Sequence, residues 1–135
     1  MINQIENVFL WSIRIYYEDT DSGGVVYYAN YLKFMERART EWLRSFNIQQ
    51  DDLREQFGII FAVRQVQIDY LLPAKFNDQL VVTAKVIKKG KASIIFEQTI
   101  VRDNEQLATA KIKIASLDAD LFKPVSMPAE ILEKL

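Results

Sequence analysis

One long segment of this chain carries apolar residues at helical spacing, and this segment constrains the fold more than any other. Its apolar residues recur at i, i+3, i+4, i+7 and i+11, which places them on one stripe of a helix: Tyr31, Phe34, Met35, Ala38 and Trp42. Asn30 is the predicted N-cap. The charged residues among them are expected on the exposed face: Lys33, Glu36, Arg37, Arg39 and Glu41. Because one apolar stripe needs one apolar sheet face, the rest of the chain has to supply a sheet.

Alternating apolar and polar residues predict that sheet. The expected strands span residues 9–17, 65–70, 80–87, 93–102 and 107–117. A short helix is predicted over residues 50–57 with Gly58 at its C-cap, and a terminal helical turn over residues 129–135. Short turns link the four later strands, so each of these is expected to pair antiparallel with the next.

Together these elements predict an α+β fold, in which a curved antiparallel sheet of about five strands wraps around one long central helix. A chain of 135 residues is expected to form a single domain over residues 1–135. A sheet of this kind leaves edges and an outer face that often associate with another subunit.

Cysteine and histidine are both absent from the chain. Their absence excludes disulfides, thiolate nucleophiles, His-based triads and His-ligated metals. Acid–base chemistry must therefore come from Asp, Glu, Lys, Tyr or the backbone. The formal net charge of -1 gives no reason to expect nucleic-acid binding. We recognise no signal peptide and no membrane-spanning apolar run, so a cytoplasmic protein without membrane insertion is expected.

An acidic loop follows the first predicted strand. Glu18, Asp19 and Asp21 precede Gly23 and Gly24, directly before the long helix. Carboxylates this close raise one another's pKa, and a helix N-terminus favours a nearby anion, so one of them is a candidate general base or nucleophile. The alternative is a solvated turn in which Asp and Ser bond their own backbone. No metal site is expected here, because the loop lacks EF-hand spacing.

Backbone donors form a second candidate group. Gly23 and Gly24 permit a turn in which successive N–H groups converge, and the N–H groups around Tyr27 and Tyr28 lie just before the helix. Such donors polarise a carbonyl in an oxyanion hole. The alternative is a plain connection into the helix.

A basic turn and an aromatic cluster complete the candidates. Lys88, Lys89 and Lys91 surround Gly90, and they either bind the phosphates of a nucleotide-like ligand or only solubilise a turn. The aromatic residues either line an apolar substrate pocket or pack in the core: Tyr16, Tyr17, Tyr27, Tyr28, Tyr31 and Phe34. Helical phase favours the core for Tyr31 and Phe34.

Two stretches of sequence are more specific than these patterns. The run YYEDTDSGGVVYYANY at residues 16–31, followed by ERARTE at residues 36–41, closely resembles the signature of the YbgC-like acyl-CoA thioesterases, relatives of 4-hydroxybenzoyl-CoA thioesterase. Similar features recur along nearly the whole chain at Tyr70, Pro73, the Lys–Gly turn before Ser93, and Pro124. The resemblance implies a hot-dog fold and hydrolysis of an acyl-CoA to free acid and CoA, without a metal or prosthetic group.

The resemblance also implies the roles of particular residues. The second Asp of the Asp-x-Asp pair, Asp21, is the catalytic carboxylate, as nucleophile or as general base, and the Tyr28 N–H polarises the thioester carbonyl. The remaining substrate contacts that we expect are Tyr17, Gly23, Gly24, Val26, Tyr27, Lys88, Lys89, Lys91 and Ser93. CoA would cross a subunit interface, with the lysine turn near its phosphates, in a homodimer or homotetramer. An acyl carrier protein is a possible partner.

The chain departs from the family at one position, because many YbgC-like members have histidine where this chain has Tyr28. That departure keeps open a non-catalytic acyl-CoA-binding or scaffold subunit. A hydratase or dehydratase is a third alternative, although such sites usually rely on a histidine, which this chain lacks.

Overall fold

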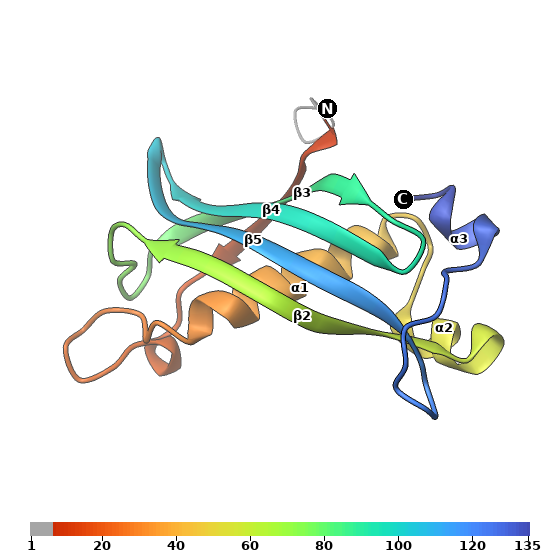
Figure 1. The fold of residues 1–135 in the computed structure, drawn as a ribbon. Helices are drawn as coiled ribbons and strands as arrows, with labels where there is room; N and C mark the ends of the chain where they lie inside the picture. Colours follow the sequence, from red (N-terminus) through yellow and green to blue (C-terminus); the bar gives the residue numbers. More distant parts are fainter. Residues whose placement is uncertain (1–6) are drawn as a thin grey trace.

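The computed structural model describes residues 7–135 as one five-stranded antiparallel sheet wrapped around a long helix (Figure 1). The strands are β1 (Phe9–Arg14), β2 (Ile59–Tyr70), β3 (Gln79–Lys89), β4 (Ser93–Arg102) and β5 (Glu105–Asp118). The helices are the 3-10 turn η2 (Tyr17–Asp19), then α1 (Asn30–Arg44), α2 (Gln50–Phe57) and α3 (Ala129–Leu132). The predicted α+β class and the sheet around one long helix are confirmed.

The strand order is β1-β3-β4-β5-β2, which corrects one expectation. Consecutive pairing holds for β3, β4 and β5, but β2 pairs with β5 and not with β3. The segment after β2 is not a tight hairpin. It ends at the opposite edge of the sheet, beside the end of β1. There the Ile15 N–H donates to Asp78 O at 2.9 Å and the Asn77 N–H donates to Ile15 O at 3.0 Å. These bonds start β3 beside β1.

The core lies between α1 and the inner sheet face. All five residues of the predicted stripe are buried, and they pack against inward-facing residues of the central strands, such as Val82, Phe96, Ile100 and Ile112. Arg39, expected on the exposed face, is also buried, which is a correction. It follows Ala38 at the margin of the stripe, where its guanidinium reaches the fully buried Gln98 of β4.

Element ends differ from the predictions for local reasons. β1 stops at Arg14, because Tyr16 begins a turn in which its N–H donates to Asp19 Oδ2 at 2.8 Å. Asn30 is the first helical residue and not the N-cap, and its side chain donates to Asp19 O at 2.9 Å. β2 starts six residues earlier than expected, at Ile59, and α3 spans only Ala129–Leu132.

Within the described part of the chain, no helix is long and apolar enough to cross a membrane. The cytoplasmic location and the single domain over residues 1–135 stay predictions.

Candidate active site

The acidic loop is fastened between the start of α1 and the segment that follows β2. Val25 forms a β-bridge with Lys75, and the Val26 N–H donates to Ala74 O at 2.8 Å. Val26, a predicted substrate contact, is thereby buried. The Tyr27 N–H donates to Asp19 O at 3.1 Å. These bonds hold the loop as a defined structure that carries Asp21 at its exposed tip.

Asp21 organises the loop through both its carboxylate and its backbone. Its Oδ1 accepts from the Gly23 N–H at 2.8 Å, and its backbone O accepts from the Gly24 N–H at 3.0 Å. Gly24 has a φ of 81°, which only glycine adopts freely. The two glycine N–H groups are therefore occupied within the loop. The other carboxylate oxygen, Oδ2, has no hydrogen bond from residues 7–135 in the structure, and the residue is exposed.

The start of α1 offers a different donor. The Tyr28 N–H has no hydrogen-bond acceptor among the described residues, whereas the Tyr27 N–H is occupied. Tyr28 comes two residues before the first helical residue, where the N–H groups of a helix are unpaired and its dipole is positive. An unpaired donor thus lies on the connection that leads from the Asp21 loop into α1, and it is suited to a developing oxyanion.

An aromatic patch surrounds this helix start. The Tyr28 ring packs against Tyr27 at 5.0 Å and against Tyr70 at 5.9 Å between centroids. Burial raises the pKa of the Tyr31 phenol, whose oxygen accepts from the Ala74 N–H at 2.9 Å. Tyr31 and Phe34 are core residues, as their helical phase predicted. Tyr16, Tyr17, Tyr27 and Tyr28 are exposed, so they are placed to contact a ligand.

The lysine turn lies at the opposite end of α1 from the acidic loop (Figure 1). The Lys89 Nζ donates to Leu132 O at 3.3 Å, and the Gly90 N–H donates to Ser93 O at 2.8 Å. Lys88 and Lys89 border a surface hollow of about 680 Å³. A 15-residue helix is about 22 Å long, so one protomer does not bring its own lysine turn and Asp21 together.

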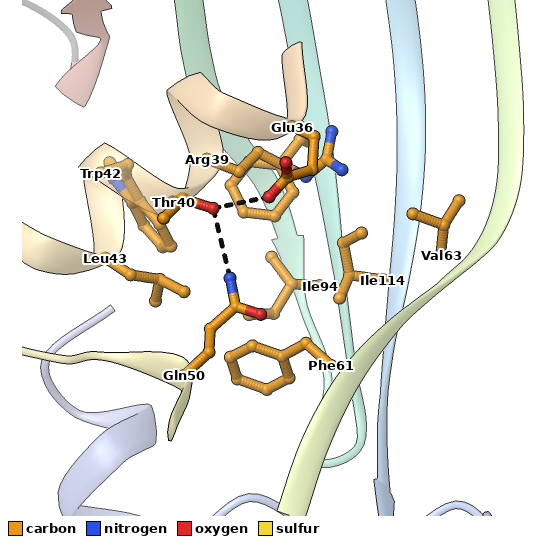
Figure 2. A pocket seen from close by; sticks show the side chains of 11 residues that line it. Glu36, Arg39, Thr40, Trp42, Leu43, Gln50, Phe61, Val63, Ile94 and Ile114 are labelled. Atoms are coloured by element: carbon orange, nitrogen blue, oxygen red, sulfur yellow. Dashed lines mark hydrogen bonds between the residues drawn. The ribbon is translucent and has the colours of Figure 1, made fainter. Parts of the chain in front are cut away.

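A cavity of about 180 Å³ opens between α1, the start of α2 and the sheet (Figure 2). Its apolar wall comes from the strands, mainly Phe61, Val63, Ile94, Phe96 and Ile114. A hydrogen-bonded chain lines the other side, in which the Thr40 hydroxyl donates to Glu36 Oε2 at 2.7 Å and accepts from Gln50 Nε2 at 3.3 Å. The cavity is therefore amphipathic and suits a small organic group.

Arg39 also lines this cavity, and its charge has no carboxylate bonded to it among the residues that the structure covers. Its Nη1 donates to Gln98 Oε1 at 2.9 Å. Burial lowers the pKa of the Arg39 guanidinium to about 10, while the charge of Glu36 opposes that shift. The cavity was not predicted from the sequence, because Arg39 was expected on the exposed face; Glu36 is exposed as expected. The signal was present in β4, where Gln98 alternates inward between Phe96 and Ile100.

Within residues 7–135, no cluster of three or more metal-ligating side chains is found. The arrangement offers a carboxylate, a backbone donor and apolar surface, which are components that acyl transfer can use.

The chain is similar to known thioesterases. The family model described as the thioesterase-like superfamily matches residues 16–135. The acyl-CoA thioesterase YbgC of Haemophilus influenzae is 45% identical over 127 residues, covering 94% of this chain and 93% of that protein. The acyl-CoA thioester hydrolase YbgC of Escherichia coli O157:H7 is 38% identical over 126 residues, covering 93% of each. The crystal structure of a probable thioesterase from Bartonella henselae has a TM-score of 0.86 at 33% identity, covering 90% of this chain and 99% of that chain.

Proposed function

The chain belongs to the thioesterase-like superfamily and, within it, to the YbgC acyl-CoA thioesterases, and from this premise we propose that Asp21 and the Tyr28 N–H carry its reaction. The protein is an acyl-CoA thioesterase, not the scaffold subunit or hydratase that the sequence left open. One observation carries the proposal: the Tyr28 N–H, at the start of α1, has no acceptor within the described residues.

The Tyr28 N–H and the positive end of α1 stabilise the negative charge that develops on the thioester oxygen. The Asp21 carboxylate either attacks the carbonyl carbon, giving an acyl anhydride that water then opens, or removes a proton from the water that attacks. In both routes the C–S bond breaks and CoA leaves as a thiolate, which takes a proton from solvent. Because a thiolate leaves readily, a site without histidine suffices.

The open edge of β2 supports a homodimer. β2 is paired with β5 on one side, and its other edge has no partner within residues 7–135. An unpaired edge of this length tends to pair with another chain. Antiparallel pairing of β2 with a second copy brings the partner's lysine turn to the end of the sheet that carries Asp21. That placement supports a CoA site shared between subunits, with Lys88, Lys89 and Lys91 near the phosphates.

The N–H role of Tyr28 is tested by comparing Tyr28→Pro with Tyr28→Ala. Proline removes the N–H at a position where no described acceptor loses a bond, whereas alanine keeps the N–H and removes the ring. We expect Tyr28→Pro to lower kcat by about 10²–10³, the usual cost of one oxyanion donor, and Tyr28→Ala to lower it far less. Equal losses in the two variants would assign the effect to the ring and refute the donor.

A further inference from the structure

The acidic loop and the first turn of α1 are bonded to one and the same peptide unit, in the segment that follows β2. Ala74 is fully buried, and both of its backbone polar groups are used. Its O accepts from the Val26 N–H at 2.8 Å, and its N–H donates to the Tyr31 phenol oxygen at 2.9 Å. Beside it, Val25 and Lys75 form a β-bridge. Ala74 therefore joins the acidic loop to α1.

The end of β4 and the start of β5 hold this segment from its other side. Arg102 Nη1 donates to Pro73 O at 3.1 Å and to Asp78 Oδ2 at 2.7 Å, and Arg102 Nη2 donates to Glu105 Oε1 at 3.1 Å. Asp78 Oδ2 also accepts from the Lys75 N–H at 2.8 Å. A segment whose buried polar groups are all paired keeps a defined position. Residues 73–75 thus form a platform, fixed to the sheet, for the acidic loop.

Hydrogen bonds through this platform connect the two groups to which we assign the reaction. The Asp21 N–H donates to Val25 O at 2.9 Å, and Val25 and its neighbour in the chain are the loop residues bonded to the platform. On the other side of Ala74, the Tyr31 N–H donates to Tyr28 O at 3.3 Å. Figure 1 shows the acidic loop, in orange, and the segment after β2, in green, at the same end of the sheet. The Tyr31 phenol oxygen is the link between the platform and the helix start.

A second tie joins the loop to α1 without reaching the sheet. The Tyr27 N–H and the Asn30 side chain both donate to Asp19 O, at 3.1 and 2.9 Å. These residues are close in the chain, so their bonds shape the loop but do not position it against the sheet. The bond from Tyr31 to Ala74 does both, because it spans 43 residues of sequence. Packing alone does not require that hydroxyl, since a phenylalanine ring would fill the same place in the core.

We propose that Tyr31 is a positioning residue for thioester hydrolysis, and that its phenol oxygen, acting through Ala74, sets the position of the Asp21 carboxylate relative to the Tyr28 N–H. The inference rests on the proposed function of those two groups. In this role the Tyr31 hydroxyl contacts no reacting atom, and its contribution is geometric. A displacement of about 1 Å between reacting groups can cost about 10² in rate.

Tyr31→Phe tests the role in catalysis, because it removes the phenol oxygen and keeps the ring. CoA release is measured with the acyl-CoA that wild type hydrolyses fastest. We expect kcat to fall at least about ten-fold while KM stays within about three-fold, because the reacting groups are displaced and the CoA contacts are not. Thr83→Val is the matched control, since the Thr83 hydroxyl accepts from the Thr99 N–H at 2.9 Å on the sheet face that turns away from α1. It should keep kcat within about two-fold of wild type.

Amide hydrogen exchange reports the position of the loop without any turnover. In Tyr31→Phe the Ala74 N–H loses its acceptor directly, but the Val26 N–H keeps its own acceptor, Ala74 O. Faster exchange at Val26 therefore means that the loop has loosened from the platform. We expect the Val26 amide to exchange at least about ten-fold faster than in wild type, relative to the β4 amides that report global unfolding. Thr83→Val should show no such change at Val26.

Four results would overturn the inference. They are a kcat of Tyr31→Phe within about two-fold of wild type, a loss confined to KM, an equal loss of kcat in Thr83→Val, and Val26 exchange that rises no more than that of the β4 amides. Full turnover by Asp21→Asn would refute the proposed carboxylate instead. The Val26 exchange would then still decide whether Tyr31 holds the loop.

Discussion

The buried contact between Arg39 and Gln98 allows a quantitative prediction about the scaffold of the cavity. Burial lowers the pKa of the Arg39 guanidinium to about 10, which corresponds to a destabilisation of its charged form by about 3 kcal/mol. The Gln98 amide partly offsets this, because a hydrogen bond to a charged group contributes about 1.5–3 kcal/mol. The pair should therefore be close to neutral as a whole but costly to break.

Three variants measure this balance. Gln98→Leu leaves the guanidinium without its acceptor and should lower the free energy of unfolding by about 2–3 kcal/mol. Arg39→Met removes the buried charge but leaves the fully buried Gln98 Oε1 without its donor, so we expect a loss of about 1–3 kcal/mol. The free energy of unfolding of the double variant should be within about 1 kcal/mol of the wild-type value, or higher than it.

Urea unfolding at neutral pH gives the three free energies and the coupling between the sites. We expect a coupling energy of at least about 2 kcal/mol. Additive losses in the double variant would refute the reasoning, since they would mean that the two side chains stabilise the protein independently.

Two further predictions concern the loops around the site. Gly24→Ala should lower the free energy of unfolding by about 1–2 kcal/mol, measured by thermal denaturation, because φ is 81° although no atom lies within 4 Å of the added Cβ. For Asp78, burial alone would raise the carboxyl pKa, but the Arg102 guanidinium at 2.7 Å and the Lys75 N–H lower it below 3.8. The stabilisation is therefore present above pH 3.8 and is lost as the pH falls through the lowered folded-state value. The free energy of unfolding of Asp78→Asn, measured in urea, should therefore fall less steeply than that of wild type as the pH is lowered. Equal slopes in the two proteins would contradict this assignment.

Local patterns were sufficient to predict the centre of the fold. The stripe from Tyr31 to Trp42 was recognisable because helical spacing is a short-range property, and every member is buried. The pairing of β2 with β5 was not, because it depends on contacts between residues far apart in the chain. Nothing local to residues 71–78 shows that this segment ends against Ile15.

The candidate site was predictable in its residues but not in its geometry. The Asp–Gly loop before the helix was visible in the sequence, whereas the use of the Gly23 and Gly24 N–H groups by Asp21 itself was not. Likewise, the separation of Lys88 from Asp21 follows from the length and direction of α1.

The most direct test of the account is release of free thiol from a panel of acyl-CoAs by wild type and by Asp21→Asn, with folding matched by circular dichroism. Asp21 is exposed, and asparagine keeps an oxygen that can accept from the Gly23 N–H, so the variant should fold normally. We expect wild type to release CoA and the variant to lose nearly all turnover. Turnover that survives in Asp21→Asn would contradict the assignment of the catalytic carboxylate.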